Sequence, residues 1–125
     1  MTDVVTLQLP RERDYFGVAH LVLGGLAARL DLTYDVLEDM TTAIDELLNR
    51  RDGSEDVTLT VKIEETAVVA TVGPFSGLVA EELRATDPGL GLRRVLETSV
   101  DEVQVSESDG ASWVELRKFL EGGGQ

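Results

Sequence analysis

The sequence contains no cysteine and a single histidine among its 125 residues. Without cysteine the chain can form neither disulfides nor thiolate zinc sites, and one histidine excludes a multi-histidine metal cage and disfavours a hydrolytic triad. Basic residues are also scarce, with 11 lysines and arginines against 24 aspartates and glutamates and a net charge of -13. Because that charge opposes approach to DNA, RNA and anionic lipid, we expect no direct contact with nucleic acid or membrane.

Long hydrophobic runs are missing as well. No apolar stretch approaches the roughly 20 residues that span a bilayer, and the first residues lack the basic and apolar segments of a signal peptide. These absences predict a cytoplasmic protein. The length of 125 residues and the apolar content of 42% are typical of a globular chain with one core. We expect one domain over residues 1–121 and a disordered, glycine-rich tail over 122–125.

The spacing of apolar residues predicts the order of the elements. A period of two predicts four strands, near 5–9, 57–63, 103–105 and 114–116, and a run that is apolar at nearly every position predicts a more buried strand over 67–72. A spacing of three and four predicts three helices, over 12–30, over 33–51 and after Gly91. Between them, Gly73 and Pro74 are expected to break a strand, and a loop with about one helical turn follows. This order predicts an α+β fold, a two-layer sandwich with three helices on one face of a mainly antiparallel mixed sheet.

Two segments have residues that suit ligand binding. At the end of the second helix, Asp45, Glu46 and Asn49 lie opposite the apolar stripe, where they face either a ligand or only water. Before the third helix, Gly89 and Gly91 allow the backbone to approach an anion, whose charge the helix N-terminus stabilises. A tight turn explains these two glycines equally well.

Taken in order, several stretches resemble a known family. They are HLVLGGLAARL, DMTTAIDELLN, DPGLGLRRVLETSVDEVQV and GASWVELRKFL. The sequence resembles the GHKL (Bergerat-fold) ATPases, and specifically the bacterial anti-sigma-factor serine/threonine kinases, over about residues 5–120. Only the third stretch is a specific motif match. The resemblance implies the histidine-kinase-like ATPase fold, with a nucleotide held between the second helix, a lid loop and the third helix.

The resemblance also implies roles for residues near the phosphates. The family's catalytic glutamate falls on Glu46, and its phosphate loop falls on Gly89 and Gly91. The asparagine that ligates magnesium, four residues after the glutamate, falls on Arg50. Asn49 lies one residue before that position. It becomes the metal ligand and nucleotide contact only if the alignment with the family is shifted by one residue.

The adenine side departs further from the family pattern. The family's aspartate, two residues before a glycine, falls on Thr71, with Gly73 as that glycine. A threonine hydroxyl accepts a hydrogen bond without the strength of a charged acceptor. The second glycine of this box is replaced by Phe75. We therefore expect degenerate nucleotide-binding boxes and weak or lost ATP binding; ATP and magnesium are the cofactors if the site is functional.

Two functions follow from the resemblance. The first is an anti-sigma-factor-like regulator that binds a sigma factor or a single-domain antagonist protein, since an acidic surface suits a basic partner. The alternative is an active ATP-dependent protein serine/threonine kinase that uses Glu46 and Asn49. The small residues Gly24 and Gly25 on the first helix suit a homodimer contact.

Three other residue types receive structural interpretations. We expect His20 to lie away from the candidate segments, without a catalytic role. Trp113 is expected in the core or on a sheet face, and Arg93 and Arg94 are expected to form local ion pairs.

Overall fold

The computed structural model describes residues 3–50, 52–53, 55–84 and 91–120. The predicted tail, residues 122–125, and Gly89 lie outside these residues. The elements in chain order are β1 Asp3–Pro10, the 3-10 helix η1 Arg13–Tyr15, α1 Phe16–Arg29, α2 Tyr34–Leu48, β2 Asp56–Ile63, β3 Ala67–Phe75, α3 Gly77–Arg84, α4 Leu92–Ser99, β4 Glu102–Ser108 and β5 Ala111–Phe119.

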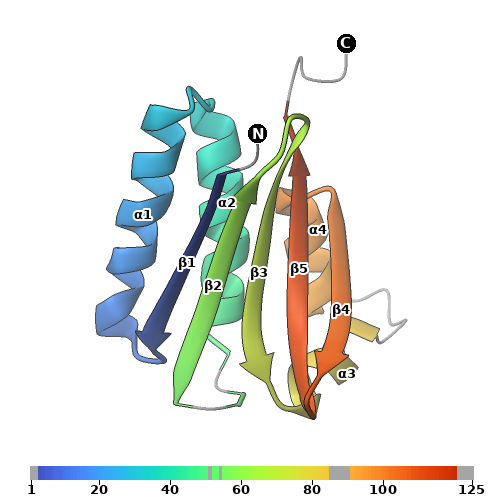
Figure 1. Cartoon of the computed structure of the whole chain (residues 1–125). Coiled ribbons are helices and arrows are strands. Elements are labelled where there is room, and N and C mark those ends of the chain that lie inside the picture. The colour runs from blue at the N-terminus through green and yellow to red at the C-terminus, as the bar shows by residue number, and fades with distance from the viewer. Residues whose placement is uncertain (1–2, 51, 54, 85–90, 121–125) are drawn as a thin grey trace.

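The strands form one five-stranded sheet in the order β1-β2-β3-β5-β4. Each of its four pairings is antiparallel. We expected a mixed sheet, but the sheet of the described residues is purely antiparallel. Figure 1 shows α1, α2 and α4 covering one face of the sheet while the other face stays open. The predicted two-layer α+β sandwich is therefore confirmed, with four α-helices in the described part of the chain where three were expected.

The core lies between α2 and the covered face of the sheet. Helix α2 begins where Thr33 caps it, because the Thr33 hydroxyl oxygen accepts from the amide of Val36 at 3.2 Å. Its apolar stripe is almost fully buried, with Met40, Ile44 and Leu47 at 2% exposure or less. This stripe and the alternating strand residues hold α2 in register over the sheet.

The prediction that the strand breaks at Gly73 was wrong, and the helical turn predicted around Val79–Leu83 is part of a longer helix. Strand β3 does not stop at Gly73, because Val72 pairs with Val114 and Phe75 pairs with Ser112. The two intervening residues lie opposite one, a β-bulge in which a proline costs no ladder hydrogen bond. The expected loop with one helical turn is α3, whose Val79, Ala80 and Leu83 are buried.

Within the described residues, no helix has both the length and the apolar character needed to cross a membrane.

Candidate functional site

Thr71 lies on the open face of the sheet. Its neighbours Ala70 and Val72 belong to the core, and successive strand side chains point to opposite faces. Thr71 is aligned with Thr60 on one side and Glu115 on the other. The structure therefore does not bring its hydroxyl together with the helices on the covered face, and its contact with adenine stays a prediction.

Gly73 has a packing reason to be glycine. A Cβ added there would lie 2.6 Å from the Trp113 ring and 3.1 Å from the Ser112 carbonyl oxygen. Trp113 thus lies over Gly73 on the open face, as the sheet-face interpretation of this aromatic predicted. A nucleotide contact at Gly73 is not tested by this arrangement.

Glu46 and Asn49 lie on the covered side, at the end of α2. Glu46 is half-buried, and Asn49 is the exposed C-cap residue of the helix. The Asn49 side-chain amide donates to the carbonyl oxygen of Asp45 at 2.8 Å. Asn49 also lines a pocket of about 450 Å³ whose other lining residues are Arg11, Glu12, Arg13, Asp14, Phe16 and Leu48. Among the residues that the structure describes, no other candidate nucleotide residue lines this pocket.

We expected His20 to lie away from the candidate segments, but it is in contact with one of them. Its Nε2 atom is 2.7 Å from a carboxylate oxygen of Asp45, next to Glu46 in sequence. The contact joins α1 to α2 because His20 belongs to the first helix and Asp45 to the second.

Arg50 takes part in a chain of contacts that links three helices. Its guanidinium forms an ion pair with Glu82 of α3 at 3.4 Å. The same Glu82 oxygen accepts a hydrogen bond at 3.3 Å from the amide of Leu92, the first residue of α4. A helix N-terminus attracts anions. The carboxylate of Glu82 therefore occupies the first amide of α4, beside Gly91, at the helix N-terminus where the sequence predicts an anion.

The backbone conformation and the packing at the start of α4 do not require glycine at position 91. This residue is the exposed N-cap with a φ of -69°, and a Cβ added there would meet nothing within 4 Å. Neither strain nor packing in the described residues requires glycine at this position. Arg93 forms a local ion pair with Glu97 at 3.3 Å, as predicted; its Nε also donates to the carbonyl oxygen of Leu83 at 2.6 Å.

Sequence reasoning missed Asp52. This aspartate is 6% exposed, and one of its oxygens accepts from the amide of Val79 at 2.8 Å. The other oxygen accepts from the hydroxyl of Ser76, the residue before α3. Asp52 therefore supplies the N-terminal cap of α3 from a separate segment. No local signal could have revealed this, because its partners lie 24 and 27 residues away.

Arg11 completes this cluster from the end of β1. Its guanidinium donates to the carbonyl oxygen of Pro74 at 2.7 Å and lies 5.1 Å from the centre of the Phe75 ring. Burial lowers the pKa of Arg11, and the nearby Asp52 carboxylate partly opposes that shift. The cluster fixes the bulged end of β3 against the start of α3.

The resemblance implies positions for magnesium and a nucleoside triphosphate among these residues. The positions for the metal ligand and the adenine acceptor are Arg50 and Thr71, a cation and a residue on the far face of the sheet. At the third position, the amide at the start of α4, the chain's own Glu82 is bound.

Comparisons with known proteins agree with the fold. No protein-family model matches the sequence. The chain is 30% identical over 144 residues to the serine-protein kinase RsbW of Listeria monocytogenes, covering 96% of this chain and 89% of that protein. It is 26% identical over 143 residues to the serine-protein kinase RsbW of Bacillus subtilis strain 168, covering 96% and 88%.

A solved structure is similar across nearly the whole chain. It contains the RsbU and RsbW domains of Rv1364c from Mycobacterium tuberculosis and matches with a TM-score of 0.71 at 17% identity. The match covers 94% of this chain and 32% of the other. At this identity the match shows a shared fold.

Proposed function

We propose that this chain, which belongs to the family of RsbW serine-protein kinases, is an anti-sigma-factor-type regulator that acts by binding a protein partner and has weak or no ATP binding. The partner is a sigma factor or a single-domain antagonist protein. The observation that carries the proposal is the contact of Glu82 with Arg50 and with the amide of Leu92.

This contact supports the loss of ATP binding on electrostatic grounds. A triphosphate at the start of α4 would meet the carboxylate of Glu82, and like charges at close range repel. The displaced Glu82 would in turn leave Arg50 without its ionic partner. Phosphoryl transfer depends on metal ions that neutralise the phosphates, and Arg50 replaces the family's magnesium ligand. We therefore expect both weak ATP binding and slow or absent phosphoryl transfer.

Calorimetric titration with ATP and magnesium tests this proposal. We expect no binding tighter than about 100 μM for the wild-type protein. Binding tighter than that value, abolished by Gly91→Trp but not by Gly91→Ala, would support the alternative, an active serine kinase that uses Glu46 and Asn49. The alanine variant is the matched control because a Cβ at Gly91 meets nothing within 4 Å.

Partner binding needs a separate assay. The purified chain is mixed with each sigma factor of its own source organism and analysed by size-exclusion chromatography. We expect a stable complex with at least one sigma factor in the absence of nucleotide. If none elutes with the chain, and the organism's single-domain antagonist homologues also fail, the binding function is wrong.

A homodimer through α1 is part of the same proposal. The outer side of this helix has two exposed apolar residues, Val18 at 38% and Leu21 at 77%, and its formally charged residue, Arg29, lies in the last turn. A Cβ at Gly25 would meet nothing within 4 Å, so a neighbouring helix can approach closely there. We expect Leu21→Arg to give a monomer by light scattering. Leu78→Arg is the control, because Leu78 is also exposed, at 65%, but lies on α3.

A further inference from the structure

Helices α3 and α4 supply caps to each other. Glu82 belongs to α3, and its carboxylate accepts from the amide of Leu92, the first residue of α4, at 3.3 Å. Arg93 belongs to α4, and its Nε donates to the carbonyl oxygen of Leu83, the second-last residue of α3, at 2.6 Å. The amides at a helix start and the carbonyls at a helix end have no partner within their own helix. Each helix therefore satisfies a free end of the other, and we call this pair of contacts the α3–α4 latch.

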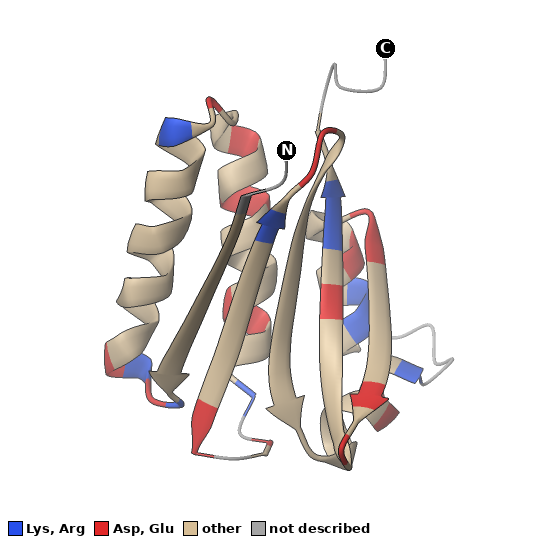
Figure 2. Ribbon diagram, in the orientation of Figure 1, with Lys and Arg blue, Asp and Glu red and all other residues tan. Residues whose placement is uncertain are grey.

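The charges of the latch suit the two helix ends. A helix has partial positive charge at its start and partial negative charge at its end, so an acidic side chain suits the start of α4 and a basic one suits the end of α3. Both contacts join a charged side chain to a backbone group, which makes them stronger than hydrogen bonds between neutral groups. Figure 2 shows the basic residues of α4 at the end of that helix toward α3. Sign and position therefore agree at both contacts.

Each charged side chain of the latch is also held by residues outside it. Glu82 forms an ion pair at 3.4 Å with Arg50, which follows the end of α2. Arg93 forms an ion pair with Glu97 at 3.3 Å and donates to the carbonyl oxygen of Val103 in β4 at 3.4 Å. These contacts fix the positions of both charged groups. The latch thus connects α3 and α4 to α2 and to the sheet.

The residues whose backbone groups the latch engages are themselves buried. Leu83 and Leu92 are both at 0% exposure and belong to the hydrophobic core. Moving α3 away from α4 would break both caps and expose apolar surface of these leucines to water, which is unfavourable. Because the caps and the leucines depend on the same approach of the two helices, we expect them to be lost together.

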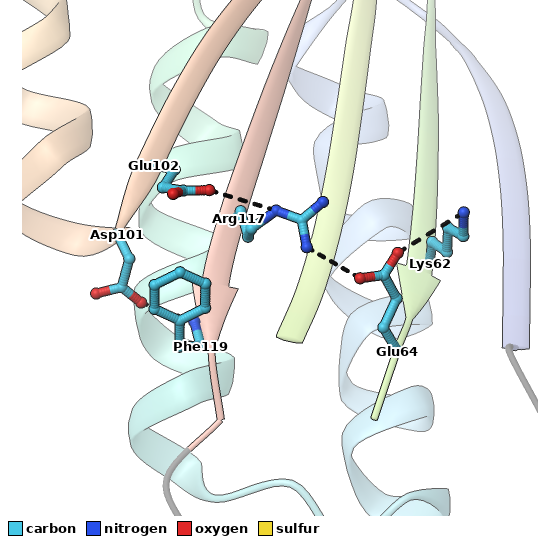
Figure 3. Close-up of polar contacts among 6 residues, drawn as sticks. All are labelled: Lys62, Glu64, Asp101, Glu102, Arg117 and Phe119. Atoms are coloured by element: carbon cyan, nitrogen blue, oxygen red, sulfur yellow. Dashed lines mark hydrogen bonds and ion pairs between the residues drawn. The ribbon is translucent and has the colours of Figure 1, made fainter. Parts of the chain in front are cut away.

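The ion pairs on the open face of the sheet have a different role. Arg117 pairs with Glu64 at 2.9 Å and with Glu102 at 3.5 Å, and Lys62 lies 3.7 Å from the same Glu64. Figure 3 shows this ladder across the strands. Backbone pairing already joins those strands, so the ladder adds side-chain contacts to an existing connection. Between α3 and α4, by contrast, the described hydrogen bonds are those of the latch.

We propose that the α3–α4 latch is a conformational device that the chain's own residues hold closed and that opens as one unit. Loss of either contact then loosens both helices. The latch follows from these contacts alone, but one consequence rests on the proposed function. A triphosphate at the start of α4 has to open the whole latch and not a single hydrogen bond, which contributes to weak ATP binding.

Hydrogen exchange on the full chain, resolved by NMR, tests whether the latch opens as one unit. Glu82→Ala removes the acceptor for the Leu92 amide, and Arg93→Met removes the guanidinium but keeps an unbranched apolar chain. In each variant we expect exchange to become about tenfold faster in α3 and in α4 alike. The amides to follow are those of Leu83, Arg84, Val95 and Leu96.

Neighbouring residues provide matched controls. Glu81→Ala and Arg94→Met remove the same charges from exposed positions on the same two helices. Arg117→Met removes a guanidinium with two ion pairs from the ladder of Figure 3. All three controls should leave exchange at the four amides unchanged. Amides of β3, in the middle of the sheet, report global unfolding, and the acceleration in the latch variants should exceed any change there.

Separate fraying of the two helices would give a different pattern. If Glu82→Ala speeds exchange only in α4, or Arg93→Met only in α3, the two caps act independently and the proposal is wrong. No acceleration in either latch variant, or equal acceleration in the controls, would also overturn it. Tight ATP binding by the wild type would refute the proposed function instead, and the exchange pattern would still decide whether α3 and α4 open as one unit.

Discussion

Replacing Asp52 with alanine should destabilise the protein by about 3 kcal/mol. The substitution removes the acceptor for the Val79 amide, a residue that is 2% exposed. A buried donor left without a partner costs about 1–3 kcal/mol. The Ser76 hydroxyl loses its acceptor as well. The half-buried guanidinium of Arg11 loses the nearby opposite charge, a smaller contribution because Arg11 keeps its bond to the Pro74 carbonyl oxygen.

Asp52→Asn separates the two contributions. The amide oxygen can still accept from Val79, so the cap of α3 is retained while the charge near Arg11 is lost. We expect a loss of about 1 kcal/mol for this variant. Urea unfolding followed by circular dichroism measures both values. For a chain of this size a loss of 3 kcal/mol lowers the urea midpoint by roughly 1.5–2 M.

The two variants together decide whether Asp52 caps α3. If Asp52→Ala falls within about 1 kcal/mol of the wild type, the carboxylate is not the cap of α3 that its contacts indicate. If Asn and Ala cost the same amount, the charge near Arg11 and not the cap carries the effect. The unfolding free energies of the two variants and the wild type can be compared only if their m-values are equal. A change in m would report a change in the unfolded or native ensemble.

Two further predictions concern single contacts. Gly73→Ala should cost about 1–3 kcal/mol in unfolding free energy and shift the tryptophan fluorescence, because a Cβ there lies 2.6 Å from the Trp113 ring. Gly91→Ala, with no atom within 4 Å, should leave the fluorescence unchanged and cost less than about 1 kcal/mol, the loss expected for alanine at an N-cap. A hydrogen bond to Glu38 raises the pKa of Tyr34, so this contact stabilises the fold below the ordinary tyrosine pKa and is lost as the pH rises through the raised value. In Glu38→Gln the ultraviolet titration of the phenolate should move to lower pH, and an unchanged midpoint would contradict the contact.

The parts of the fold that sequence predicted well are those governed by local periodicity. The stripe that includes Met40, Ile44 and Leu47 specifies α2 and its buried face at once, since a helix repeats every 3.6 residues. Alternation in the strands likewise specifies which side chains are buried. Both signals need no knowledge of partners elsewhere in the chain, and both agree with the observed burial.

The errors arise where pairing between strands decides the outcome. A glycine followed by a proline ordinarily ends a strand, yet Gly73 and Pro74 form a bulge because β5 continues beside them to Ser112. The face of Thr71 depends on the same pairing. Counting residues back from a glycine gives Thr71 a role in a nucleotide site, but the counting does not say which side of the sheet the residue occupies.

The candidate nucleotide site shows the same limit at longer range. The resemblance implies that Arg50 stands where the family has an asparagine, and by itself this implies only a missing metal ligand. The structure adds that Arg50 pairs with Glu82, and that Glu82 holds the amide of Leu92. The two contacts share one carboxylate, because Glu82 pairs with the Arg50 guanidinium and also supplies the acceptor that the N-terminus of α4 needs. The altered residues thus form a consistent set of internal contacts across three helices, which supports a domain that is stable without nucleotide.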